Sequence, residues 1–308
     1  MQIFSGISDF KIEAPTAAAI GKFDGVHLGH KVLIEDIIAV SKLNGYKSVI
    51  FTFSPSPESF FCGRALKELT TTAEKRKIFE SMGIDILIEF PMNKETAATD
   101  PELFISKYLC EQMNVKYISA GADISFGDKG KGNADLLKQC EKQYGYECHI
   151  VDKVMYHDEN ISSTLVRSVV SEGRMEEATL LLGNPYKITG VVVHGKALGR
   201  TLNMPTANVN VAPDKLIGPT GVYFTMVHTP YGDFPGTSNV GVKPTVSNEG
   251  YVSIETYLYN FNEDLYGKYI EVDLLKFSRP EMKFSSVEEL KNQMEKDLEN
   301  GRSFHGIK

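Results

Sequence analysis

The chain has 308 residues, 42% hydrophobic and 24% charged, an ordinary globular composition whose length suggests two domains. Its formal net charge of -7 argues against a nucleic-acid-binding surface, because a phosphate backbone requires a basic patch. The four cysteines have no C-x-x-C spacing, which argues against a metal cluster and a disulfide framework. With no signal-peptide pattern and no apolar run of membrane-spanning length, we expect a cytoplasmic protein without a membrane partner, either a monomer or a weak homo-oligomer.

Short apolar strands alternate with helices from Thr16 to about Leu182. Strands are predicted over residues 16–20, 47–53, 84–90, 115–120 and 146–151. Helices are predicted over residues 31–44, 74–82, 101–113, 134–144 and 175–182, the third capped by Asp100. This alternation predicts a doubly wound α/β domain, a parallel sheet covered on both faces with ligands at the carboxyl ends of its strands.

The pattern changes at residues 183–185, Gly-Asn-Pro, which break the preceding helical pattern. We therefore expect domains at residues 1–183 and 184–308. The second contains β-rich runs over residues 188–194, 222–228, 253–260 and 269–277, separated by Gly, Pro, Asn and Asp. Such runs predict a small antiparallel barrel or sandwich. Residues 286–298 are predicted to close the chain as an amphipathic helix that starts with a Ser-x-x-Glu cap.

The run GKFDGVHLGH, residues 21–30, joins the first predicted strand to the first predicted helix. Such a turn offers unpaired backbone N–H groups and the positive end of the helix dipole, which suit phosphate. Gly25 and Gly29 lack Cβ atoms and allow close approach, while His27 and His30 can each donate an imidazole N–H. A zinc site is disfavoured, since no nearby Cys or carboxylate completes a four-ligand set. Either histidine alone would be an ordinary turn residue.

A second run, ISSTLVR at residues 161–167, begins another predicted helix. An ordinary helix cap usually carries an acid three residues after the Ser or Thr, but Leu165, Val166 and Arg167 occupy those offsets. Hydroxyl and N–H groups at a helix start, with a guanidinium one turn later, can form a phosphate site. On this run alone, simple capping remains the alternative.

The two runs resemble the H-x-G-H and I-S-S-T-x-x-R signatures of nucleotidylyltransferases, in the longer form found in bacterial bifunctional riboflavin kinase/FAD synthetases. The run GADISFG, residues 121–127, resembles the loop that lines the flavin and nucleotide sites in that family. The resemblance implies catalytic roles for His27, His30 and Arg167 and flavin contacts for Asp123 and Phe126. It implies ATP contacts for Gly21, Phe23, Asp24, Gly29, Ser162, Ser163 and Thr164.

The run GVVVHGKALGRTLNMPTAN, residues 190–208, resembles the riboflavin kinase domain, with its Gly-rich loop followed by P-T-A-N. Gly-rich loops can turn backbone N–H groups toward phosphates, although P-T-A-N alone is typical of a turn. The Thr206 hydroxyl and the Asn208 amide oxygen are hard donors suited to Mg²⁺. The resemblance implies ATP contacts for Gly195, Lys196, Gly199 and Arg200, and flavin contacts for Arg279 and Phe284.

Glu255 lies on the predicted strand 253–260, on the face opposite Ile254, Thr256 and Leu258. By composition it is a solvated carboxylate; by resemblance it is the general base that takes the proton from the ribityl 5′-hydroxyl of riboflavin. The resemblance thus implies two reactions. The C-terminal domain would phosphorylate riboflavin with Mg-ATP, and the N-terminal domain would adenylylate the resulting FMN to FAD with release of pyrophosphate.

Three departures from the family pattern motivate an alternative, a monofunctional enzyme in which one site has decayed. Ser56 stands where the family commonly has His, Ile124 replaces a Phe, and Asn203 replaces a Gly. An alternative of another class is a non-catalytic flavin carrier. Two phosphate motifs and Glu255 argue against it, because storing a flavin requires neither.

Overall fold

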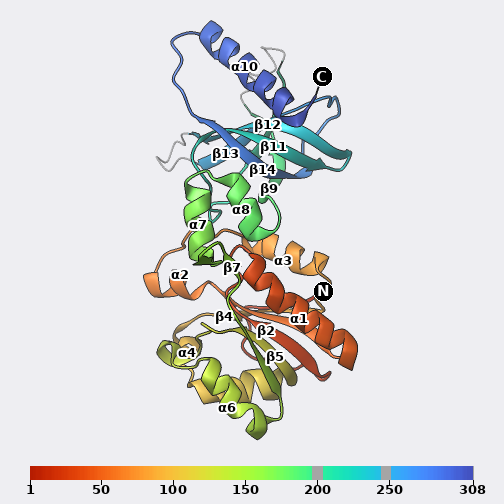
Figure 1. Ribbon diagram of the computed structural model, residues 1–308, viewed down its shortest axis with the longest axis vertical. Coiled ribbons are helices and arrows are strands. Elements are labelled where there is room, and N and C mark those ends of the chain that lie inside the picture. Colours follow the sequence, from red (N-terminus) through yellow and green to blue (C-terminus); the bar gives the residue numbers. More distant parts are fainter. Residues whose placement is uncertain (196–203, 244–250, 308) are drawn as a thin grey trace. The chain divides into compact units, whose positions relative to one another are not determined.

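The computed structural model describes residues 1–195, 204–243 and 251–307. Lys196, Gly199, Arg200 and Asn203 therefore lie outside the described residues. The chain divides into two compact units, Met1–Ser163 and Thr164–Lys308 (Figure 1). The predicted fold class is confirmed: the first unit contains a parallel sheet with helices, and the second a closed antiparallel barrel with a terminal helix.

The first unit is built on a six-stranded parallel sheet in the order β1-β4-β3-β2-β5-β6. The strands are β1 (Gln2–Ser5), β2 (Thr16–Ile20), β3 (Lys47–Ser54), β4 (Ile86–Pro91), β5 (Val115–Gly121) and β6 (Glu147–Val151). Five of them were predicted. The sequence pattern missed β1, which is short, largely exposed and confined to the edge of the sheet.

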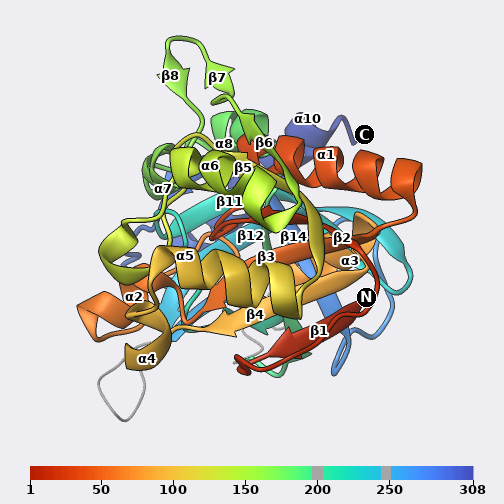
Figure 2. The ribbon, with the colours of Figure 1, turned by 90° about the horizontal axis from the view of Figure 1, so that it is seen from below.

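Helices cover both faces of this sheet, as Figure 2 shows from below. The helices of this unit are α1 (Leu28–Asn44), α2 (Pro57–Cys62), α3 (Thr72–Ser81), α4 (Lys94–Ala97), α5 (Pro101–Leu103) and α6 (Ala134–Tyr144), with a π-helix at Phe104–Gln112 and a 3₁₀ turn at Asp128–Gly130. Ala17 and Ala19 of β2 pack toward α1 and α3, whereas Ala18 and Ile20 pack toward the π-helix and α6. A small hairpin, β7 (Met155–Tyr156) and β8 (Glu159–Asn160), follows β6.

The helix predicted over residues 101–113 begins as expected, because Asp100 Oδ1 accepts hydrogen bonds from the N–H groups of Glu102 (2.9 Å) and Leu103 (3.2 Å). Its type was predicted wrongly. After one α-helical turn the chain winds as a π-helix, and the N–H of Met113 bonds to the carbonyl of Tyr108, five residues back. Hydrophobic spacing alone does not separate these two windings.

The order of the strands determines where the GKFDGVHLGH run, residues 21–30, lies in the sheet. β2 lies between β3, which follows it in the chain, and β5, which the chain reaches only after β4. The connections after β2 and β5 therefore leave toward opposite sides of the sheet. In open α/β sheets the crevice at such a reversal, outside the carboxyl ends of the strands, is the usual ligand site. Residues 21–27 and 122–127 follow these two strand ends.

The second unit is a closed barrel of six antiparallel strands in the order β10-β13-β12-β11-β14-β9. The strands are β9 (Tyr186–Val193), β10 (Ala207–Asn210), β11 (Gly221–Thr229), β12 (Gly232–Lys243), β13 (Tyr251–Leu258) and β14 (Tyr269–Pro280). β10 and β12 were not predicted as strands. Two helices precede the barrel, α7 (Ser163–Ser171) and α8 (Met175–Leu182), and α8 packs against β9 and β14.

The predicted alternation of β13 is confirmed: Ile254, Thr256 and Leu258 are buried while Glu255 is only half-buried. The buried hydroxyl of Thr256 bonds to Ser238 Oγ at 2.7 Å, and Ser238 bonds in turn to Thr225 at 2.9 Å. This chain links β13, β12 and β11 and satisfies polar groups that would otherwise be costly to bury. Glu255 is thereby left on the outer face of the barrel.

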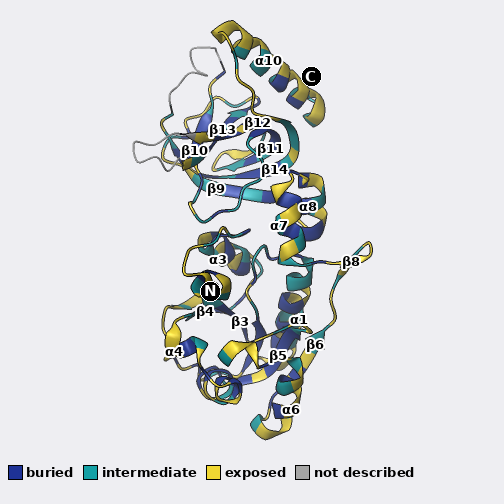
Figure 3. Cartoon of the chain, turned by 90° about the vertical axis from the view of Figure 1, so that its left-hand side faces the viewer, coloured by how far each residue is buried: buried dark blue, intermediate teal, exposed yellow. Residues whose placement is uncertain are grey.

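The terminal helix α10 (Val287–His305) is capped by Ser286 as predicted, although it extends beyond residue 298. Its outer side is largely exposed (Figure 3). It docks on the barrel through the ion pair of Asp297 with Arg279 and through Gly301, where a Cβ would lie 2.2 Å from the hydroxyl oxygen of Tyr259. The barrel therefore fixes the position of α10.

Candidate functional site

The histidine pair lies at the very start of α1. The helix begins at Leu28 rather than at Lys31, so His30 lies in its first turn and His27 caps it. Nδ1 of His27 accepts a hydrogen bond from the N–H of His30 at 3.4 Å, and the two rings stack with centroids 3.7 Å apart. Since Nδ1 is an acceptor, the neutral ring of His27 carries its proton on Nε2. That N–H remains available as a donor.

The stacked pair depends on its neighbours in the motif. A Cβ on Gly29 would lie 3.2 Å from atoms of the His27 ring, tighter than ordinary contact. On the other side, the fully buried ring of Phe23 packs 5.1 Å from the His30 ring. Phe23 has a positive φ of 51°, unusual for a bulky side chain, and this tight turn places its ring against that of His30. Gly29 and Phe23 therefore build the site.

For the FAD formation that the resemblance implies, we expect Gly29→Ala to lower the rate by up to about 10²-fold. A methyl group would displace the His27 ring, and such misplacements carry costs of this order. Helix propensity alone would favour alanine at this position, so global stability should not fall correspondingly. Steady-state kinetics with FMN and Mg-ATP measures the effect, with FMN formation from riboflavin as the internal control. An unchanged adenylyltransfer rate would show that ring placement does not depend on Gly29.

Burial sets the charge of both histidines. It lowers the pKa of His27 to about 4, an effect that the Asp123 carboxylate opposes only in part. The pKa of His30 is well below its usual value through burial and the nearby charges of His27 and Lys75. His30 Nδ1 is buried and, among the described residues, has no hydrogen-bond partner. At neutral pH both rings are therefore neutral, and each carries one N–H donor.

These shifts make the first unit acid-sensitive. In the unfolded chain His27 takes up a proton near pH 6.5, whereas in the folded protein its pKa is about 4. The unfolded state therefore gains protons first as the pH falls. The contribution of neutral His27 to the free energy of unfolding is complete above about pH 6.5 and is lost as the pH falls toward 4. We expect the proton uptake of His27 alone to lower the free energy of unfolding by about 2 kcal/mol at pH 5 relative to pH 7. Urea unfolding at both pH values, for the wild type and for His27→Gln, measures the difference. An equal loss in both proteins would contradict this expectation.

The two phosphate motifs meet within the first unit. Ser163 Oγ donates to the carbonyl of Asp24 at 2.8 Å, and the carbonyl of Ile161 lies 3.8 Å from where a Gly29 Cβ would be. The Asp24 carboxylate accepts from the N–H of Leu69 at 2.8 Å. The structure thus gives Asp24 a scaffolding role, and its ATP contact stays a prediction.

The second half of the ISSTLVR run belongs to the other unit. Thr164 and Arg167 lie on α7, beyond the division after Ser163. Their predicted contacts with ATP phosphates stay predictions. Ser162 and Ser163, by contrast, remain in the same unit as the histidine pair.

The loop after β5 contributes one accessible carboxylate. The side chain of Asp123 is 69% exposed, lies 3.1 Å from Lys153 Nζ, and acts electrostatically on His27. Phe126 is only 4% exposed, and its ring packs 5.3 Å from Phe104. Its geometry is that of a core residue. The flavin contact of Phe126 stays a prediction, and little of its ring is exposed to make it.

Ser56 has a local structural role. Its Oγ caps α2 by accepting from the N–H of Ser59 at 3.4 Å. Glu58, in the first turn of the same helix, forms an ion pair with Lys22 of the GKFDGVHLGH run. This departure from the family pattern therefore stabilises a helix that is tied to the first motif.

The second site is a cluster on the outer face of the barrel. In the strand register Glu255 stands directly opposite Asn208 of β10, and Gly195 packs against that asparagine, since a Cβ there would lie 2.6 Å from its amide atoms. The amide nitrogen of Asn208 donates weakly to the Thr206 carbonyl at 3.5 Å. The structure therefore brings together four residues that the two kinase motifs had predicted.

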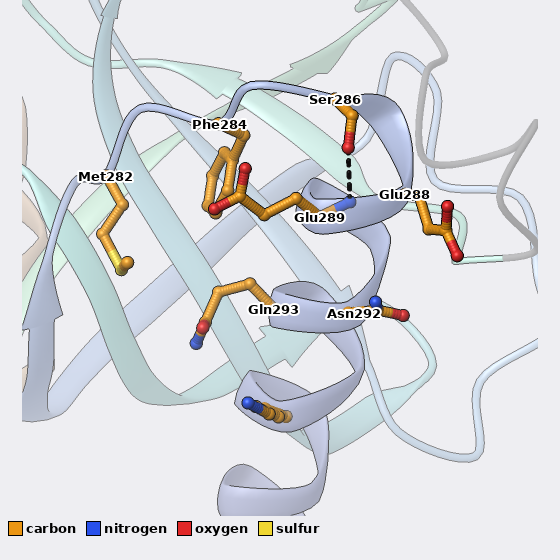
Figure 4. A pocket seen from close by; sticks show the side chains of 8 residues that line it. Met282, Phe284, Ser286, Glu288, Glu289, Asn292 and Gln293 are labelled. Carbon is orange, nitrogen blue, oxygen red and sulfur yellow. Dashed lines mark hydrogen bonds between the residues drawn. The ribbon is translucent and has the colours of Figure 1, made fainter.

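A pocket of about 430 Å³ lies between α10 and the segment before it (Figure 4). Phe284 and Met282 extend into it from that segment, and Glu289 and Gln293 line it from α10. The sequence pattern pointed to Phe284 but missed the helix residues, because the Ser-x-x-Glu run reads as a cap. Arg279, the other predicted flavin contact, pairs with Asp297, so its flavin role stays a prediction.

Two family models match the chain. The one described as FAD synthetase covers residues 9–165, and the one described as riboflavin kinase covers residues 182–305. Together they span both units. No helix among the described residues is long and apolar enough to cross a membrane.

Relatives named bifunctional riboflavin kinase/FMN adenylyltransferase match along the full length. The Buchnera aphidicola (Schizaphis graminum) protein is 37% identical over the whole of both chains. The Listeria monocytogenes protein is 36% identical over 93% of this chain and 91% of its own. The Escherichia coli K12 protein is 34% identical over 100% and 99%.

A solved structure from Streptococcus pneumoniae, titled as a macrolide-efflux protein, superposes with a TM-score of 0.85 at 29% identity, covering 97% of this chain and 98% of its own. The monofunctional alternative is not favoured, because both family domains are present and the full-length relatives bear the bifunctional name. Both units thus carry the motifs and the fold of one two-domain enzyme, and the chain belongs to the bifunctional riboflavin kinase/FMN adenylyltransferase family.

Proposed function

We propose that the chain converts riboflavin to FAD in two steps at two separate sites, the outer face of the barrel and the start of α1. The observation that carries this proposal is the stacked His27–His30 pair at the reversal point of the parallel sheet, held as neutral donors. We place the working domains at residues 1–183 and 184–308, and we propose a cytoplasmic protein that is a monomer or weak homo-oligomer.

In the adenylyltransfer step, a phosphate oxygen of FMN attacks the α-phosphorus of ATP and the bond to the β-phosphate breaks, releasing pyrophosphate. His27 and His30 would donate N–H groups to phosphate oxygens as charge develops on them, together with backbone N–H groups at the start of α1. Ser162, Ser163, Thr164 and Arg167 would hold the remaining phosphates. Alignment and charge stabilisation suffice, and no covalent enzyme intermediate is needed.

In the kinase step, the ribityl 5′-hydroxyl of riboflavin attacks the γ-phosphorus of ATP and ADP leaves. Glu255 would accept the hydroxyl proton, and its half-buried position beside Asn208 and near Gly195 supports that role. Lys196, Gly199 and Arg200, which lie outside the described residues, remain proposed ATP contacts. The pocket beside Phe284 would receive the flavin ring.

The donor set beside Glu255 fits magnesium. The Asn208 amide nitrogen donates to the Thr206 carbonyl, and the amide oxygen is the atom of this side chain that would bind the ion. Mg²⁺ typically takes one or two protein oxygens and completes its shell with phosphates and water, so Thr206 and Asn208 would be enough. Among the described residues no group of three or more His, Cys, Asp or Glu side chains could hold a metal ion. Bound magnesium would neutralise phosphate charge.

A time course tests the proposal. The protein is incubated with riboflavin and Mg-ATP, and riboflavin, FMN and FAD are separated at intervals. We expect FMN to appear first and FAD to follow, with one ADP and one pyrophosphate released for each FAD. A second sample without ATP measures flavin binding alone. Stable flavin binding without ATP consumption would instead identify a flavin carrier.

A further inference from the structure

A row of polar side chains crosses the outer face of the barrel at Glu255. The strand register pairs Glu255 with Asn208 of β10 on one side and with Asn239 of β12 on the other. Residues directly opposite in an antiparallel ladder share a face, with Cβ atoms about 4.5–5.5 Å apart. Both amides are therefore within reach of the Glu255 carboxylate. Asn208 belongs to the metal site proposed above, whereas Asn239 has no role in the mechanism so far.

Asn239 stands out from its strand. Its neighbours Ser238 and Val240 have exposed fractions of 0%, and Asn239 itself is exposed. Two residues further along the same face is Gly241. The Oε1 atom of Glu281 lies 2.7 Å from the position of a Gly241 Cβ, and the amide nitrogen of Asn239 lies 3.3 Å from the same position. The Glu281 carboxylate and the Asn239 amide therefore both border the space that the missing side chain of Gly241 leaves.

The Asn239 amide therefore lies opposite one carboxylate, Glu255, and borders the gap at Gly241 together with a second, Glu281. An amide nitrogen has two N–H donors, and a carboxylate accepts from both directions. A neutral donor opposite Glu255 can fix the orientation of its carboxylate. Hydrogen bonds to charged groups are stronger than those between neutral groups.

We propose that Asn239 is a positioning residue for the kinase step. In the reacting complex its amide donates to the Glu255 carboxylate, which stands directly opposite it in the strand register. Glu281 and the gap at Gly241 serve to aim the amide. The inference rests on the proposed role of Glu255 as the base, and it adds the group that orients the base.

The test compares Asn239→Ala with Asn210→Ala, an exposed asparagine on the neighbouring β10 whose register partner is Ser253 rather than Glu255. We expect Asn239→Ala to lower the kcat of FMN formation by about 10- to 10²-fold, the loss of one hydrogen bond to a charged group. The KM for riboflavin should change little, since substrate contacts remain. Asn239→Ser, which retains a donor, should recover part of the rate, and Asn210→Ala should behave as the wild type.

Asn239→Asp, which is isosteric but lacks the donor, should lose at least as much activity as Asn239→Ala. Glu281→Ala should lower kcat in the same direction, with riboflavin binding retained. Flavin fluorescence and the melting temperature report whether the barrel is intact. Wild-type kcat in Asn239→Ala would overturn the inference, as would a raised KM with unchanged kcat, which would make Asn239 a substrate contact.

A cycle with Glu255→Gln separates this inference from the function on which it rests. If Glu255→Gln abolishes FMN formation and Asn239→Ala does not reduce it, the base is right and the positioning role is wrong. If Glu255→Gln retains full activity, the assignment of the base itself has failed. When both are right, Asn239→Ala should cause no further loss in the Glu255→Gln background, because the group it orients can no longer take the proton.

Discussion

Replacing both His27 and His30 by alanine is expected to stop FAD formation almost completely, because each lost donor to developing phosphate charge costs about 10²-fold or more. The burial of His27 strengthens the expectation, since a hydrogen bond from a buried donor stabilises charge better than one in solvent. With riboflavin and Mg-ATP as substrates, the variant should accumulate FMN. Flavins separated by chromatography at fixed times measure the effect.

A histidine elsewhere in the first unit provides the control. His149 is 53% exposed, pairs with Asp36 at 2.9 Å and lies on β6, outside the motif. His149→Ala should form FAD at the wild-type rate. The single variants His27→Ala and His30→Ala should each show a partial loss. A double variant with normal FAD formation would remove the histidine pair from the mechanism.

Changing Glu255 to Gln is expected to lower the kcat of FMN formation by about 10²–10⁴-fold, the usual contribution of a positioned general base. Glutamine retains the size of the side chain and most of its hydrogen bonding but cannot accept the proton. Riboflavin binding should therefore survive. FAD formation from FMN should be unchanged, because Glu255 belongs to the barrel and the histidine pair to the other unit. Parallel assays with riboflavin and with FMN measure both activities.

Glu263→Gln is the matched control, since this glutamate is exposed on the loop between β13 and β14. It should retain both activities. Loss of both activities in Glu255→Gln would argue that the units do not function independently. Full kinase activity would mean that another group takes the proton or that the hydroxyl needs no base.

Much of the fold follows from local patterns. The apolar strands at residues 16–20 and 115–120 are recognisable because parallel strands are buried on both faces. The barrel was harder to predict. β10 has only four residues and follows a proline, so its sequence reads as a turn, and it becomes a strand only by pairing with β9 and β13. Strand pairing between distant segments leaves little trace in the local sequence.

The candidate sites likewise combine features that local sequence predicts with features that only tertiary contacts determine. The glycines and histidines of the first motif predict a phosphate turn, but His27 as the helix cap does not fit the usual Ser, Thr, Asp or Asn preference. Phe126 and Arg279 were predicted to contact flavin. The ring of Phe126 packs against Phe104, and Arg279 pairs with Asp297, and both contacts form only in the folded tertiary structure. Asn239 became a candidate only through the strand register, because fifteen residues of chain lie between it and Glu255.

The central claim, two sites on one chain that work in sequence, is tested most directly by mixing the two inactive variants. His27→Ala/His30→Ala alone should convert riboflavin to FMN and stop, and Glu255→Gln alone should leave riboflavin essentially unchanged. Mixed in one tube with riboflavin and Mg-ATP, they should form FAD, since FMN made by one variant is adenylylated by the other. FAD production from riboflavin by either variant alone, or a mixture that accumulates FMN without FAD, would contradict the account.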